Sequence, residues 1–223
     1  MKWKYRPVQQ PKMPAMSQPL ALNLTGHLLI AMPGLEDSLF GGSVVYVCEH
    51  NHQGALGLII NKTTDLQARH LFARLDLNLP REDLADMPVL MGGPLHQDRG
   101  FVLHDTTAAA PSQCGTGSDG EQAASGTAYA SSLPITDGLA LTSSRDVMEA
   151  ISQGGGPRHA LMALGCSSWD GGQLESELAA NAWLTVQASP ALLFQLGPEQ
   201  RYGKALELLG IHAHQLASVA GHA

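Results

Sequence analysis

The chain has 223 residues, of which 44% are hydrophobic and 15% are charged. A chain of this length buries about 70% of its unfolded surface, which suffices for one good core. The apolar fraction excludes a disordered chain. No apolar run approaches the roughly 18 residues of a transmembrane helix, so we expect no membrane span.

Charge is unevenly distributed along the chain. Four basic residues precede position 13 without any acidic residue, and the rest of the chain carries 9 basic and 20 acidic residues, a balance of −11. Phosphate contacts supply most of the affinity of DNA-binding proteins, so direct binding to duplex DNA is not expected. Residues 1–22 hold four prolines and no periodic pattern, which predicts a disordered basic arm.

The amino-terminal residues and the cysteines predict a cytoplasmic location. The start is basic but lacks the apolar region of a secretory signal. Cys48, Cys114 and Cys166 are odd in number and have no CxxC spacing, which argues against a disulfide framework. Cys48 lies in an apolar run, where a free cysteine behaves as a small hydrophobic residue.

Apolar runs and turn signals predict strands and helices in irregular alternation. Two β-branched runs separated by residues 51–53 predict a hairpin. Thr64 as N-cap and Gln67 three residues later predict a helix over 65–75. Further helices are predicted over 144–152, after Asp170, and from Pro198 to Leu209. The predicted strands are 27–32, 43–50, 54–61, 88–92, 100–104, 127–133, 138–142, 159–165 and 183–187. This order is typical of an α+β fold with a mixed sheet.

Residues 106–126 interrupt this pattern. They are small, polar and aperiodic, and they offer no apolar side chain that a core would bury. They predict a flexible surface insertion within one domain over 23–223. Cys114 lies inside the insertion, and no basic neighbour activates its thiol.

Several blocks of the sequence resemble the YqgE/AlgH family of bacterial proteins. They occur in family order and cover about residues 23–223, outside the arm and the insertion. The blocks are LIAMP (29–33), SVVYVCEHNHQGALGLIINK (43–62), MGGP (91–94), DRGF (98–101), LH (103–104), TSSRD (142–146), GGQLE (171–175), NAWL (181–184) and VAGHA (219–223).

This resemblance implies a structure more than an activity. It implies a cytosolic, single-domain α+β protein, whose mixed, bifurcated β-sheet is curled into a pseudo-barrel with packed helices. One branch of the family is named from alginate regulation and is labelled a transcriptional regulator. The family brings no established catalytic residues to this sequence.

Two constellations have the residue types of catalytic or metal sites. Residues 48–52 read Cys-Glu-His-Asn-His, but a strand places only Cys48 and His50 on one face, and a tetrahedral site needs more ligands. We therefore predict a hydrogen-bonding role there, no metal and no cofactor. Residues 165–169 lack the second glycine of a nucleophile elbow and predict a structural turn.

Six polar residues at strand ends or helix starts are candidates for ligand binding: His50, Asn61, Lys62, Arg99, His104 and Arg145. Arg145 opposes the dipole of the helix that it begins, so we expect a carboxylate partner, with Asp98 and Asp105 as candidates. The alternative is that Arg145 binds an anionic ligand. Gly92-Gly93 precedes no helix, which favours a role in backbone conformation over phosphate binding.

Three functions remain open. The first is a non-enzymatic protein that binds a partner protein or a small ligand in a regulatory role. The second is an enzyme that acts on an anionic small molecule through Arg99, Arg145 and His50, and the third is a DNA-binding transcriptional regulator. A deep polar cleft that holds those three side chains would favour the enzyme, whereas a shallow apolar patch would favour the binding protein.

We predict that residues 106–126 are dispensable for folding. Replacing them with a short Gly-Ser link should shift the melting temperature little, because loop length enters the closure entropy only logarithmically. Thermal melts of the two proteins test this. A large loss of stability would show that the segment packs on the core.

Overall fold

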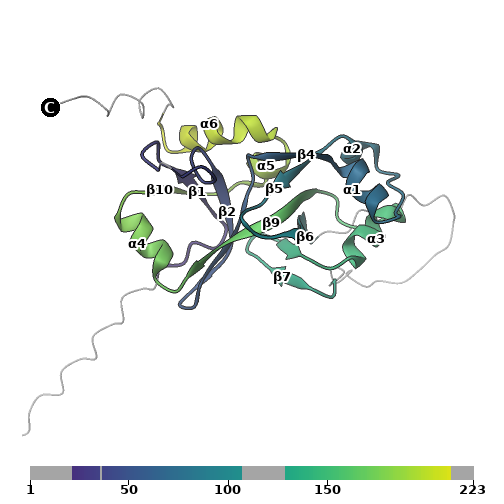
Figure 1. The fold of residues 1–223 in the computed structure, drawn as a ribbon, viewed down its shortest axis with the longest axis horizontal. Coiled ribbons are helices and arrows are strands. Elements are labelled where there is room, and N and C mark those ends of the chain that lie inside the picture. Colours follow the sequence, from purple (N-terminus) through teal and green to yellow (C-terminus); the bar gives the residue numbers. More distant parts are fainter. Residues whose placement is uncertain (1–21, 36, 107–128, 212–223) are drawn as a thin grey trace, which may run out of the picture.

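The structure is a computed structural model that describes residues 22–35, 37–106 and 129–211 (Figure 1). The predicted arm lies outside these residues except for Leu22, and so does the predicted insertion except for Thr106. Cys114 also lies outside them.

One curled sheet organises the described residues. Its strand order is β10-β1-β2-β3-β9-β6-β8-β7, with β4 and β5 attached beside this path. All pairs are antiparallel except β5 with β9, which makes the sheet mixed. The strands are β1 (His27–Ala31), β2 (Val44–Asn51), β3 (Gly54–Ile59), β4 (Thr63–Gln67), β5 (Pro88–Met91), β6 (Leu95–Asp105), β7 (Ser132–Pro134), β8 (Leu139–Thr142), β9 (Ala160–Asp170) and β10 (Trp183–Gln187).

The sheet bifurcates at β9, which crosses the middle of the molecule (Figure 1). The carboxyl-terminal part of β9 pairs with β3, from Ser167 to Asp170. Its amino-terminal part pairs with β6 along one edge and with β5 along the other, where Leu90 lies opposite Ala163. The predicted α+β class with a mixed, bifurcated and curled sheet is confirmed; the curl forms a half-barrel.

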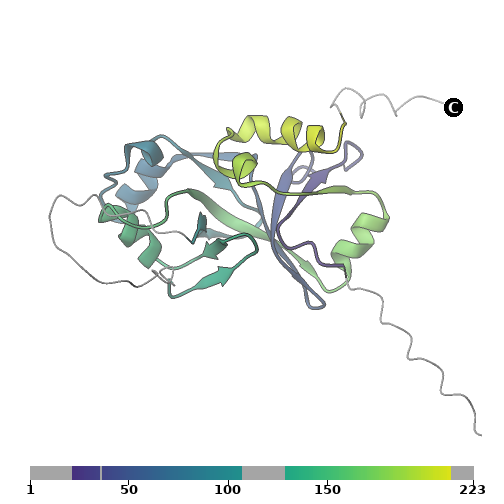
Figure 2. The same cartoon turned by 180° about the vertical axis from the view of Figure 1, so that it is seen from behind.

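Six helices in the described ranges cover the sheet: α1 (Ala68–Arg74), α2 (Glu82–Ala85), α3 (Asp146–Ser152), α4 (Gln173–Ala179), α5 (Pro190–Phe194) and α6 (Pro198–Leu208). The helices α5 and α6 pack side by side, on β9 and on β1–β2 respectively (Figure 2). The helices α1, α2 and α3 share a core with β6 and β9. Among these described helices, none is long and apolar enough to cross a membrane.

Burial on both faces explains the continuous apolar runs of the sequence. In β1, Leu28 and Ile30 enter the core beneath α5 and α6. Their neighbours Leu29 and Ala31 enter a second core on the opposite face, together with Leu174 of α4. Successive strand residues point to opposite faces, so a strand covered on both sides requires apolar residues at every position. The predicted hairpin is present, because β2 and β3 pair antiparallel.

The predicted start of the first helix is wrong. Residues 63–67 form β4, which pairs with β5, and the helix begins only at Ala68. Thr64 does not cap the helix; its hydroxyl donates to the carbonyl oxygen of Val89 at 2.9 Å. Pairing with a distant strand therefore outweighs the local capping pattern. The short helices α2 and α5 carry too few periodic positions to be predicted.

The turn predicted over 165–169 is also wrong, because these residues continue β9. The strand accommodates Gly165 at a φ of +75°, which favours glycine. The Gly92-Gly93 segment crosses β9 at this point. The Gly92 amide donates to the carbonyl oxygen of Leu164 at 2.8 Å, and the Gly92 carbonyl accepts from the amide of Ile59 at 2.8 Å. A backbone role for Gly92-Gly93 therefore agrees with this geometry.

We predict that Gly93→Ala destabilises the fold by more than about 2 kcal/mol. Gly93 has a φ of +156°, and a Cβ there would collide with the backbone of Cys166. Gly100→Ala is the matched control on β6, since a Cβ at Gly100 meets no atom within 4 Å. Urea unfolding measures both variants. Equal losses would contradict the importance of this crossing.

Candidate functional site

The structure separates the six predicted ligand-binding residues. His50 lies at the end of β2 beside α4, and Asn61 and Lys62 lie between β3 and β4. Arg99 lies exposed in the middle of β6, His104 lies near the carboxyl end of that strand, and Arg145 directly precedes α3. The chemistry of each position shows which of them are free to bind a ligand.

His50 joins three segments of the fold. Its imidazole is buried, with 1% of the side chain exposed. The amide of Leu24 donates to Nδ1 at 3.1 Å, so Nε2 carries the proton and donates to the Glu175 carboxylate at 3.1 Å. Both ring nitrogens are thus engaged, which matches the predicted hydrogen-bonding role. In the described ranges, no three His, Cys, Asp or Glu side chains cluster as a metal site requires.

Asn61 and Lys62 stabilise the loop before β2. The Asn61 side-chain oxygen accepts from the amide of Val44 at 2.7 Å, and its nitrogen donates to the carbonyl oxygen of Gly42 at 2.9 Å. The Lys62 ammonium donates to the carbonyl oxygens of Leu39 and Gly41. These side chains satisfy backbone groups that would otherwise lack partners.

His104 is buried within the sheet. Its Nδ1 donates to the carbonyl oxygen of Asp105 at 2.8 Å, so in the neutral ring Nε2 accepts from the Thr142 hydroxyl, also at 2.8 Å. Burial lowers the pKa of His104, against the raising effects of this hydrogen bond and of the Asp105 charge. The ring is therefore held in its neutral form near neutral pH.

The predicted carboxylate partners of Arg145 are wrong. Its Nε donates to Glu149 at 2.9 Å, one helical turn along α3, and its Nη2 donates to the carbonyl oxygen of Leu75 at 2.8 Å. Asp105 instead accepts from His159 at 2.7 Å. The Arg145 and Glu149 side chains are 54% and 48% exposed, so this pair contributes less than about 1 kcal/mol to stability.

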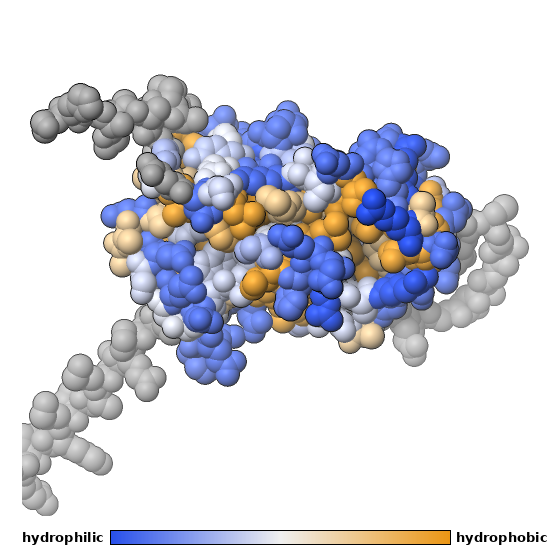
Figure 3. All heavy atoms as spheres, in the orientation of Figure 1, coloured by the Kyte–Doolittle hydropathy of each residue, from blue (hydrophilic) through white to orange (hydrophobic). Residues whose placement is uncertain are grey.

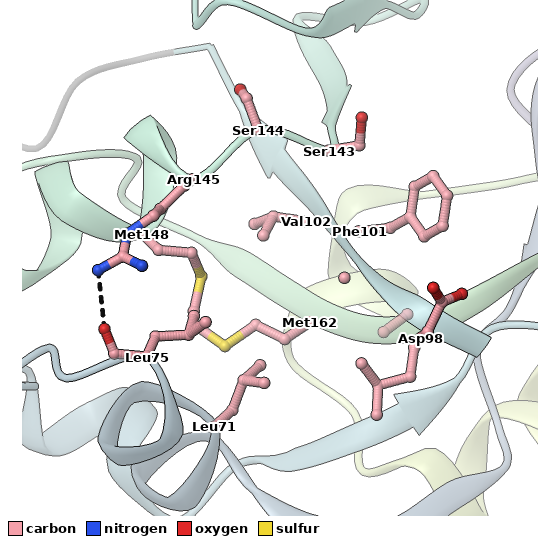
Figure 4. A pocket seen from close by; sticks show the side chains of 13 residues that line it. Leu71, Leu75, Asp98, Phe101, Val102, Ser143, Ser144, Arg145, Met148 and Met162 are labelled. Carbon is pink, nitrogen blue, oxygen red and sulfur yellow. Dashed lines mark hydrogen bonds between the residues drawn. The ribbon is translucent and has the colours of Figure 1, made fainter. Parts of the chain in front are cut away.

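A hollow of about 210 Å³ lies beside Arg145, between β6, α1 and α3 (Figure 4). Its walls are mostly apolar and come from four elements. They include Leu71, Leu75, Val102, Met148 and Met162. Polar groups lie at its rim: Ser143, Ser144, Arg145 and Asp98. In Figure 3, hydrophobic surface is exposed over this half of the molecule, and hydrophilic side chains border it.

The end of β8 explains why the hollow exists. Strand β8 stops at Thr142, opposite Val102 of β6, and the chain then leaves the sheet toward α3. Strand β6 extends beyond this point to Leu95, so β8 does not cover its amino-terminal half. Methionine side chains adapt to irregular spaces, and Met148 and Met162 contribute to the wall.

The hollow brings together only one of the six predicted residues, Arg145. Neither His50 nor Arg99 lines it, so this hollow does not bring together the three residues predicted for an enzyme. The two cysteines in the described ranges, Cys48 and Cys166, are buried, and burial raises the pKa of each thiol. Sequence reasoning missed the hollow because its walls come from positions far apart in the chain.

The fold and the sequence place the chain in a known bacterial family. A family model described as AlgH-like matches residues 28–214. The UPF0301 protein of Verminephrobacter eiseniae is 54% identical over 203 residues, covering 91% of this chain and 97% of that protein. The UPF0301 protein of Paracidovorax citrulli is 53% identical over 215 residues, covering 95% and 100%. The chain therefore belongs to the AlgH-like family, as its resemblance predicted.

Two solved structures share the fold. The solution structure of the AlgH protein from Pseudomonas aeruginosa has a TM-score of 0.67 and 41% identity, covering 93% of this chain and 100% of that chain. A crystal structure of a Corynebacterium diphtheriae protein has a TM-score of 0.60 at 20% identity, covering 86% and 87%. The second similarity concerns the fold alone.

We predict that His104 makes stability fall in mild acid. Its folded-state pKa is lowered, so the unfolded chain takes up a proton first as the pH falls below about 6.5. Stability should therefore decrease from about pH 7.5 to about pH 5.5, and His104→Gln should reduce this decrease. Urea unfolding at both pH values measures the slope. An identical slope in wild type and variant would contradict the prediction.

Proposed function

We propose that this AlgH-like protein is a non-enzymatic binding protein with a regulatory role. Its ligand is a small molecule with an apolar body and an anionic end, which binds in the hollow between β6, α1 and α3. The observation that carries this proposal is an apolar hollow with a half-exposed arginine, Arg145, at its rim.

The walls favour an apolar ligand body. Burial of apolar surface contributes about 25 cal/mol per Å², and the side chains of Leu71, Leu75, Met148 and Met162 provide that surface. At about 30 Å³ for each water molecule, a volume of about 210 Å³ corresponds to about seven waters. The ligand is accordingly small.

The rim charges orient the ligand. Among the described residues, no hydrogen bond engages Nη1 of Arg145, which leaves donors for an anion. Ser143 beside Arg145 adds a hydroxyl group, whereas the hydroxyl of Ser144 donates to Asp146. Asp98 lies at another part of the rim and repels an anion. The anionic end therefore binds at the Arg145 side.

The lining residues favour binding over catalysis. Among the described residues, Ser143 carries the one rim hydroxyl that forms no hydrogen bond, but no histidine, lysine or cysteine lines the hollow to activate it. Regulation through direct DNA binding conflicts with the −11 balance beyond residue 12. A regulatory effect would therefore pass through the ligand or a partner protein.

We predict that octanoate raises the melting temperature of the wild-type protein more than octanol does. Arg145→Ala should remove this difference, because the cation that pairs with the carboxylate is lost. Without ligand, Arg145→Ala should change the unfolding free energy by less than about 1 kcal/mol, since the Glu149 pair is exposed.

Arg158→Ala is the control, because it removes the same charge from an exposed residue outside the hollow. Thermal melts of the three proteins, with and without each compound, give the result. Equal protection of wild type and Arg145→Ala by octanoate would refute binding at this rim.

A further inference from the structure

A second cavity, of about 300 Å³, lies at the start of α6, away from the hollow that Arg145 borders. Its lining comes from β5, β9, α2 and the α5–α6 connection. Apolar side chains dominate it: Met87, Pro88, Leu90, Leu161, Phe194 and Leu196. One basic residue lines it, Arg201 of α6.

Arg201 is a buried cation without an ion-pair partner among the described residues. Only 2% of the residue is exposed. Its Nη1 donates to the carbonyl oxygen of Ile60, and its Nη2 donates to that of Leu193 at 2.8 Å. Neutral carbonyls thus take the place of a carboxylate, and none of the ion pairs among the described residues includes Arg201. Burial lowers its pKa to about 10, against the raising effect of Glu199.

The Nε–H group of Arg201 lacks any acceptor. It is one of two buried side-chain polar atoms in the described ranges without a hydrogen-bond partner. An unsatisfied buried donor is costly, and a charged one more so. The eleven-residue helix α6 adds its amino-terminal dipole beside the same cavity, which Gly197 and Pro198 line. A buried cation with one free donor thus lies beside a cavity that a helix amino terminus also borders.

We propose that this cavity is a second binding site, which takes a small aromatic monocarboxylate whose carboxylate pairs with Arg201. A single free buried donor suits a monoanion. Phe194, Pro88 and Met87 offer flat or polarisable surfaces against which an aromatic ring packs.

The position of Asp83 favours one orientation of the bound ligand. Asp83 also lines the cavity, and Arg81 holds its carboxylate through bonds of 2.8 and 2.6 Å. A carboxylate ligand is repelled by Asp83 and attracted by Arg201, so its ring lies toward Asp83 and its anionic end toward α6. Desolvation inside the cavity strengthens the attraction to Arg201.

The direct test follows the Nε–H resonance of Arg201 by NMR while benzoate or benzyl alcohol is added. Loss of one signal in Arg201→Lys assigns the resonance. Benzoate should shift it strongly, because a carboxylate becomes its acceptor, and benzyl alcohol should shift it much less. An unmoved resonance at saturating benzoate would overturn the proposal, and so would equal shifts with both compounds.

A cavity-filling variant provides a test that keeps Arg201 in place. Leu196→Trp should fill the cavity and weaken benzoate binding at least about tenfold. Leu208→Trp is the matched control, because Leu208 is 46% exposed on α6 and does not line the cavity. Calorimetric titration of the two variants measures the affinities. Equal affinities would overturn the proposal.

Arg145→Ala separates this site from the hollow beside α3. Benzoate binding should be unchanged in that variant, whatever becomes of octanoate binding. A loss of benzoate binding in Arg145→Ala would place the aromatic carboxylate in the hollow and refute the second site.

Discussion

The structure depends on the way β9 shares its two edges among three strands. Along one edge it pairs with β6; along the other it pairs first with β5 and then with β3. The change of partner requires the backbones of β9 and the Gly92-Gly93 segment to approach closely, and a side chain at Gly93 or Gly165 would occupy that space. The hollow beside α3 is lined by residues of β6 and β9, and the cavity beside α6 by residues of β5 and β9, so both border the strand at which the sheet splits.

Local patterns predicted the local structure, and long-range pairing determined the rest. The β2–β3 hairpin followed from two adjacent apolar runs, because its strands are neighbours in sequence. Strand β4 was misread as the start of a helix, because only β5, more than twenty residues away, stabilises it as a strand. The early start of β6 at Leu95 was equally hidden, since β9 is its partner. One missed contact did have a local signal: Glu149 lies four residues after Arg145, the spacing of a helical ion pair.

Most of the polar strand-end residues that suggested a ligand site serve the fold. Asn61, Lys62 and His50 each engage backbone groups of other segments, so their polarity is explained by satisfying buried donors and acceptors. Arg201 was overlooked for the opposite reason. It lies four residues before Ala205 on the inner face of α6. A single arginine among the apolar residues of that face interrupts the periodic pattern, and the pattern alone does not indicate that its charge is buried. A polar residue at an apolar position of a helical pattern therefore indicates a binding group better than a polar residue at a strand end does.

Both proposed sites attract anions in a chain whose formal net charge is −7. The long-range field of such a protein repels an anion, but that field is screened within a Debye length of about 8 Å at physiological salt. Recognition must then come from short-range contacts with one guanidinium. At Arg201 the surrounding protein excludes water, so the attraction is much less screened than at the exposed Arg145. The exposed arginine favours a ligand held mainly by its apolar body, whereas the buried one favours a ligand selected by its charge.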